Sequence, residues 1–160
     1  MRGRPAEAPH APPPYLQVSL RLAALLHAEV IKYSQEWVEG SGDLEDRLAA
    51  LGRRVGFRLA ELLQFRSGST RREVRILGLL YHLNGTVWKT VTGKMLDSLE
   101  KSTARDDEYM VTDNENPTTR FTALPREMAE FNCAAYHAGI IAGVLYGAGF
   151  VGHLLPRSPP

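Results

Sequence analysis

The chain has 160 residues, 44% of them hydrophobic, and a formal net charge of +1 at pH 7. This length suits one domain that buries most of its apolar surface, whereas two domains of half the length would each be marginal. The near-neutral charge does not point to nucleic acid or to an acidic partner. The single cysteine, Cys133, excludes an intramolecular disulfide and a metal site made of several cysteines.

The two ends of the chain are predicted to be disordered. Residues 1–14 are rich in alanine and proline, cannot supply a core and lack the apolar stretch of a signal peptide. Residues 157–160 are expected to be disordered as well. A single domain is therefore predicted over residues 15–156.

Three amphipathic helices are predicted over residues 20–37, 44–65 and 70–92, because apolar residues recur there at three- and four-residue steps. The short stretches 40–42 and 67–69 separate them, and Asp43 is the expected N-cap of the second helix. The second helix also carries a stripe of small residues that predicts close contact with another helix: Ala49, Gly52, Gly56 and Ala60.

The pattern changes after residue 93. Residues 94–107 are polar and irregular, whereas 109–112 and 121–124 are predicted to be the strands of a hairpin, joined by turn-forming residues 113–117. Residues 151–155 are expected to add a last edge strand. The order of helices, hairpin, buried helix and final strand predicts an α+β fold with an antiparallel sheet.

The segment "FNCAAYHAGIIAGVLYGAGF", residues 131–150, contains no Asp, Glu, Lys or Arg. A membrane-spanning helix needs ~20 residues that are mostly large and apolar. This segment has few large residues, so we predict a buried core helix that ends near Tyr146. Its small residues form a ridge on which another backbone can lie: Ala135, Gly139, Gly143 and Gly147.

Cys133 and His137 are the strongest candidates for chemistry, because a thiol four residues from an imidazole on one helix can start a nucleophilic site. Free cysteines are mostly buried, and the spacing supplies no third orienting residue, so we predict no catalytic residue here. The other histidines lack the spacing of metal ligands: His27, His82 and His153. No enzyme activity, metal or cofactor is therefore expected.

The charge is unevenly distributed along the chain. Between Arg47 and Lys94 eight arginines and two lysines stand against two acidic residues, Glu61 and Glu73. This excess indicates either a solvated helical surface or basic helices that make peripheral contact with anionic lipid or with an acidic partner. Nucleic acid is not expected, because aromatic residues do not alternate with the arginines.

Six segments resemble the Bet-three family, the small subunits of the TRAPP vesicle-tethering complex, and within it the subunit-five branch. They cover most of residues 19–150, and the two most specific are Val87-Trp88-Lys89 with Gly93-Lys94 and Asp97, and the start of the last helix. The segments are "AEVIKYSQ" (28–35), "LAALGRRVGFRLAELL" (48–63), "VWKTVTGKMLDSLEK" (87–101), "YMVTD" (109–113), "LP" (124–125) and "FNCAAYHAGIIAGVL" (131–145).

The resemblance implies the family's α/β plait, in which helices pack on one side of an antiparallel sheet. It implies a structural subunit of a complex that acts as nucleotide-exchange factor for a Rab-type GTPase in transport from the endoplasmic reticulum to the Golgi apparatus. The expected partners are other TRAPP small subunits and, through the assembled complex, the Rab-type GTPase. The expected location is cytoplasmic, peripheral to Golgi and endoplasmic reticulum membranes.

The first two helices carry more apolar residues than one buried face requires, which is typical of partner sites. We predict a helix-on-helix contact with another small subunit, formed in or beside Tyr33, Trp37, Leu44, Leu48 and Leu51. An internal core is the alternative role of these five residues. An alternative function also stays open, a module that binds an acyl chain or a similar apolar ligand in a pocket lined by the second and last helices.

Overall fold

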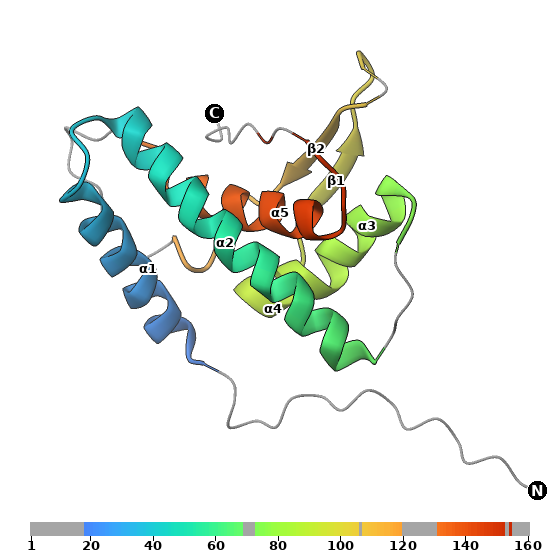
Figure 1. Ribbon diagram of the computed structural model, residues 1–160, viewed down its shortest axis with the longest axis horizontal. Coiled ribbons are helices and arrows are strands. Elements are labelled where there is room, and N and C mark those ends of the chain that lie inside the picture. Colours follow the sequence, from blue (N-terminus) through green and yellow to red (C-terminus); the bar gives the residue numbers. More distant parts are fainter. Residues whose placement is uncertain (1–17, 69–72, 106, 120–130, 153, 155–160) are drawn as a thin grey trace, which may run out of the picture.

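The computed structural model of the chain describes residues 18–68, 73–105, 107–119, 131–152 and 154 (Figure 1). Helices pack against a small antiparallel sheet, which confirms the predicted α+β class. The predicted tails, 1–14 and 157–160, lie outside the described residues. The elements are α1 (Leu20–Gln35), α2 (Ser41–Ser67), α3 (Ile76–His82), η2 (Leu83–Trp88), α4 (Lys89–Thr92), β1 (Ser98–Lys101), β2 (Tyr109–Thr112) and α5 (Ala135–Gly147).

Helices α2 and α5 lie in direct backbone contact, as the stripes of small residues predict (Figure 1). A Cβ atom on Gly52 would lie 3.0 Å from the Ile140 nitrogen, and one on Gly143 would lie 2.8 Å from the Phe57 nitrogen. A Cβ atom on Gly56 would overlap the carbonyl oxygen of Ile140. Only glycine therefore fits where the two helices cross.

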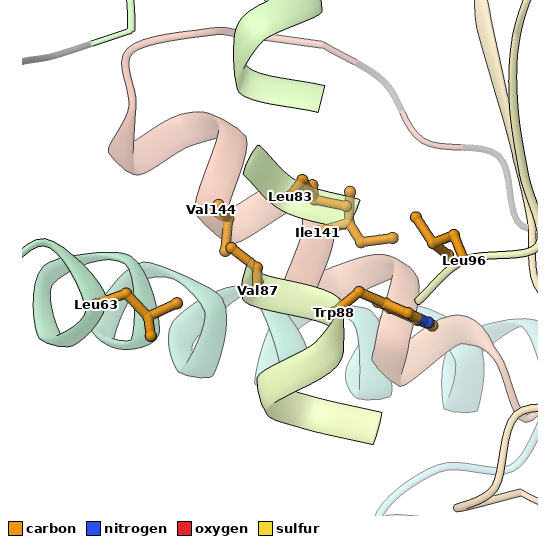
Figure 2. Packing of buried hydrophobic residues seen from close by; sticks show 7 residues of the cluster. All are labelled: Leu63, Leu83, Val87, Trp88, Leu96, Ile141 and Val144. Carbon is orange, nitrogen blue, oxygen red and sulfur yellow. The ribbon is translucent and has the colours of Figure 1, made fainter. Parts of the chain in front are cut away.

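Helix α5 is buried on a second side by the main hydrophobic core. Its Ile141 and Val144 face the π-helical segment η2, as Figure 2 shows, and Val111 of β2 packs against the same cluster. No helix among the described residues is long and apolar enough to span a bilayer. The buried members of this cluster are Leu63, Leu83, Val87, Trp88, Leu96, Ile141 and Val144.

The third predicted helix, over 70–92, is wrong as a single element. Within the described residues the helix begins at Ile76 and continues through the π-helical turns of η2 into the short α4, where Gly93 ends it with a left-handed φ of 82°. Asn84, in the π-helical stretch, accepts a hydrogen bond of 2.8 Å from the Leu96 nitrogen. The π-helical stretch places Leu83, Val87 and Trp88 together in the core.

The predicted hairpin is also corrected. Strand β2 pairs with β1, in the region predicted to be irregular, with Leu99 opposite Val111 and Lys101 opposite Tyr109. Residues 121–124, the predicted second strand, lie outside the described residues. The predicted last strand, 151–155, is wrong for its described members, because Val151, Gly152 and Leu154 are not in a strand.

A polar brace holds the hairpin onto the end of the helical segment. The indole Nε1 of Trp88 donates a hydrogen bond of 3.2 Å to Asp113 Oδ2, and Lys94 forms an ion pair with Asp113. Lys94 also lies 3.5 Å from Asp97 Oδ1, and Asp97 Oδ2 accepts a hydrogen bond of 2.7 Å from the Asn114 nitrogen. The most specific residues of the family resemblance therefore support the fold rather than a ligand site.

The start of α5 is fixed in the same way. The Asn132 nitrogen donates a 2.8 Å hydrogen bond to Glu45 Oε1 on α2, and Asn132 Oδ1 accepts one of 2.8 Å from the Ala134 nitrogen. The side chain thus satisfies a backbone donor just before the first turn of α5, and the backbone ties that turn to α2.

We expect Gly56→Ala to destabilise the chain by at least about 2 kcal/mol, because the added methyl group must push the α5 backbone away. Gly42→Ala is the matched control, since nothing lies within 4 Å of a Cβ atom there. Alanine at position 42 should be neutral or stabilising by up to ~1 kcal/mol. Urea denaturation followed by circular dichroism measures both, and equal stabilities of the two variants would contradict the described helix crossing.

Candidate partner interface

Helix α1 is attached to the rest of the chain through one face. Ser19 caps its start by accepting a 3.3 Å hydrogen bond from the Leu22 nitrogen. One side of the helix is buried, mainly against α2 and α5, and consists of Ala24, His27, Ile31 and Ser34. This leaves the opposite side of α1 free of contacts with α2 and α5.

The exposed side of α1 carries an apolar stripe, which the exposed Glu29 interrupts between Leu26 and Tyr33. Each of its members is more than half exposed. Tyr33 and Trp37 stand at its C-terminal end with ring centroids 6.1 Å apart. Apolar stripes that include aromatic residues are typical of partner sites. The members of the α1 stripe are Leu22, Leu25, Leu26, Tyr33 and Trp37.

The predicted interface residues do not all lie on this surface. Tyr33 and Trp37 are exposed by 55% and 62%, whereas Leu51 is half-buried. Leu44 and Leu48 are fully buried, because they form a core cluster with Ile31, Phe131 and Ala135. These two leucines therefore pack against the buried side of α1 and are not accessible to a partner. A partner contact at Tyr33 and Trp37 stays a prediction.

The apolar surface of α2 extends beyond the part that α1 covers. Val55 and Leu62 follow Leu48 at seven-residue steps, which place all three on the same side of the helix. Leu48 is buried beneath α1, whereas Val55 and Leu62 are exposed by 43% and 42%. The candidate interface therefore consists of the α1 stripe with Val55 and Leu62 of α2.

Arg47 of α2 stands at the edge of this candidate interface. Its guanidinium carbon lies 5.8 Å from the centroid of the Trp37 ring, within the range of a cation–π contact. Its Nε atom is buried without a hydrogen-bond partner. Asp46 and Glu45, the nearest acidic residues in sequence, and Asp43, one turn before, form no ion pair with it in the described part of the chain. No pattern in the sequence predicts this contact between Arg47 and Trp37.

The Cys133–His137 pair is not arranged for catalysis. Burial raises the pKa of the Cys133 thiol, which disfavours the reactive thiolate. His137 instead shares a 2.8 Å hydrogen bond between its Nε2 and the Thr118 hydroxyl. Among the described residues no three His, Cys, Asp or Glu side chains are grouped as metal ligands.

His137 and His27 form a buried imidazole pair at the junction of α1 and α5. Their ring centroids lie 5.0 Å apart, and the Trp88 ring meets His137 edge-on at 5.9 Å. Burial lowers the pKa of His27, and burial together with the nearby His27 lowers the pKa of His137 to about 3. Both rings are therefore neutral at physiological pH. Neither nitrogen of His27 has a hydrogen-bond partner.

The alternative function, an acyl-binding pocket between the helices and the sheet lined by α2 and α5, stays a prediction. Such a pocket does not lie at the crossing of these two helices, because they meet there without room for a Cβ atom on Gly52, Gly56, Gly139 or Gly143. The exposed arginines of α2 lie elsewhere on that helix. Arg58 makes a 3.4 Å ion pair with Glu61, in which both side chains are exposed and the contact is weak.

Comparisons with known proteins give a consistent result. Residues 23–154 match the family described as Transport protein particle (TRAPP) component. Trafficking protein particle complex subunit 5 of Dictyostelium discoideum is 42% identical over 134 residues, which cover 84% of this chain and 72% of that protein. The protein of the same name from Homo sapiens is 37% identical over 137 residues, 86% of this chain and 73% of that protein.

A more distant relative and a solved structure extend the comparison. Trafficking protein particle complex subunit 31 of Saccharomyces cerevisiae is 26% identical over 88% of this chain and 71% of that protein. The crystal structure of a trafficking protein particle complex subunit 3 from Naegleria fowleri, covalently bound to palmitic acid, superimposes with a TM-score of 0.69. It covers 81% of this chain and 79% of that one at 18% identity, which shows a shared fold.

We expect the free energy of unfolding to fall as the pH drops below about 6.5. The pKa of folded His137 is about 3, whereas the unfolded residue binds a proton near pH 6.5, so acid favours the unfolded chain between these values. Protonation of unfolded His137 alone should lower the free energy of unfolding by about 2 kcal/mol between pH 7 and pH 5. Urea denaturation at both pH values measures this loss.

The pH dependence should flatten in His137→Gln and stay unchanged in His82→Gln, because His82 is exposed. An identical slope in His137→Gln and the unsubstituted chain would show that His137 is not responsible.

Proposed function

The chain belongs to the Transport protein particle (TRAPP) component family, and we propose that it binds other small subunits of that complex through the α1 stripe and the neighbouring surface of α2. A subunit of this family has a structural role in a vesicle-tethering complex. The assembled complex acts as nucleotide-exchange factor for a Rab-type GTPase in transport from the endoplasmic reticulum to the Golgi apparatus.

The exposed apolar stripe on α1 is the observation that supports this interface. Apolar side chains of this size gain roughly 1.5–3 kcal/mol each when they pass from water to full burial. A partner helix laid along α1 would remove Leu22, Leu26 and Tyr33 from water together. A stripe of this kind on a helix held by its other face indicates helix-on-helix packing between subunits.

The chain contributes structure rather than chemistry to the complex. Its one thiol is shifted away from the thiolate, and its buried histidines are neutral. We expect contact with the Rab-type GTPase to be made through the assembled complex, as the membership of the family implies. The location that suits this role is the cytoplasmic surface of Golgi and endoplasmic reticulum membranes.

Peripheral membrane contact would come from the basic side of α2. Arg53, Arg54 and Arg58 are exposed there, and each cation near an anionic membrane contributes about 1 kcal/mol. We expect the chain to sediment with vesicles that contain phosphatidylserine and to stay in solution with phosphatidylcholine alone. Arg53→Glu with Arg58→Glu should abolish sedimentation, whereas Glu100→Gln should leave it unchanged. Equal sedimentation with both kinds of vesicle would contradict a charge-driven contact.

Affinity purification of the tagged chain from its own cells should recover other TRAPP small subunits. We expect Trp37→Ala to weaken binding of the recovered subunit by at least about 2 kcal/mol, because tryptophan is among the residues that dominate the binding energy of such interfaces. The free chain should stay folded, since Trp37 is 62% exposed.

Tyr146→Ala is the matched control, because this aromatic residue is also 62% exposed but lies on α5, away from the stripe. Isothermal titration calorimetry measures the affinities and circular dichroism the fold. An affinity unchanged by Trp37→Ala, or loss of the fold in that variant, would overturn the interface.

A further inference from the structure

We propose that Arg47 determines the specificity of the partner interface by binding a carboxylate on a helix of the partner subunit. This inference rests on the proposed function, because it requires a partner that covers the α1 stripe. It goes further in stating the chemistry that this partner must present. The argument depends on the position of Arg47, its missing ion pair and its contact with Trp37.

The position of Arg47 couples it to the aromatic end of the stripe. Its guanidinium carbon lies 5.8 Å from the centroid of the exposed Trp37 ring. A partner that packs on Trp37 and Tyr33 therefore also covers the guanidinium group and removes water from it. Any partner that docks on this end of the stripe therefore also desolvates Arg47.

The described part of the chain supplies no carboxylate for this cation. Asp43 lies one turn before Arg47 on α2 and Asp46 directly precedes it, yet neither forms an ion pair with it in the part that the structure describes. The neighbouring members of the stripe are apolar. Since arginine stays charged at any physiological pH, docking buries an uncompensated charge unless the partner neutralises it.

The hydrogen-bonding state of Arg47 points to the same ligand. Its buried Nε has no acceptor in the free chain, which lowers the stability of that state. A carboxylate can accept from Nε and a terminal nitrogen of one guanidinium group together. The side chain is only partly buried, so it can turn towards a partner carboxylate and give Nε an acceptor.

Specificity follows from the cost of a mismatch. A partner helix with a carboxylate opposite Arg47 gains a charge-assisted hydrogen bond in a surface that excludes water. A partner with an apolar or basic residue there leaves the guanidinium buried and unpaired, and is rejected. The α1 stripe alone would bind apolar helices with little discrimination, so Arg47 selects among them.

The test uses the small subunit that co-purifies with the chain, prepared separately, and full-length variants of this chain. Arg47→Met keeps the aliphatic stem over Trp37 and removes the charge and the donors. Its affinity for the subunit should fall at least about 10-fold. Arg47→Lys keeps the charge without the planar group and should recover only part of the loss.

Arg66→Met is the control, because Arg66 is exposed in the last turn of α2, ~28 Å along the helix from Arg47. This variant should bind the subunit with the affinity of the unsubstituted chain. Raising the salt concentration should lower the affinity of the unsubstituted chain for the subunit more than it lowers the affinity of Arg47→Met. If Trp37→Ala weakens binding while Arg47→Met stays within twofold at every salt concentration, the carboxylate inference is wrong and the interface stands. If neither variant changes the affinity, the proposed interface itself is wrong.

Discussion

The contact between α2 and α5 determines the arrangement of the remaining elements. Two backbones can lie this close only where one of the two facing residues has no Cβ atom. At the crossing Gly52 and Gly56 of α2 lie against the α5 backbone, and Gly139 and Gly143 of α5 lie against the α2 backbone. The close approach fixes the rotation of α5 about its own axis. Its larger side chains then point away from α2, where Ile141 and Val144 pack against η2 and the hairpin. A helix with no charged residue is thereby covered on both sides without a membrane.

The polar residues that distinguish this sequence stabilise the same arrangement. Trp88, Lys94 and Asp97 converge on Asp113 and Asn114, so the strand β2 is held at the end of the helical segment. The backbone N–H of Asn114 and the charge of Lys94 lower the pKa of Asp97, which keeps this carboxylate ionised in the brace. Residues of this kind resemble an active site in sequence, but their partners in the structure are one another. The free surface of α1 is the part of the chain that we propose for interaction with another protein.

The helices were predictable from sequence and the hairpin was only partly so. The spacing of apolar and small residues in α1, α2 and α5 follows helical periodicity, which a sequence records directly. Strand β1 contains one large apolar residue, Leu99, and forms because distant residues hold it, so it has no local signal. The exposure of Tyr33 and Trp37 matched the surplus of apolar residues on α1. The burial of Leu44 and Leu48 depends on Phe131, 83 or more positions later, and could not be read from the helix alone.

Helix α1 carries an unfavourable feature on each of its two sides. On its inner side His27 is buried without hydrogen bonds, which makes the attachment of α1 weaker than its apolar contacts suggest. On its outer side an apolar stripe faces water. A partner that binds only the docked position of α1 stabilises that position by mass action, by about 2.7 kcal/mol at a concentration of 100 Kd. The α2–α5 pair needs no such support, because its contact is internal. In the proposed interface, association therefore acts mainly on α1, and the helix that binds the partner is also the helix that the partner stabilises.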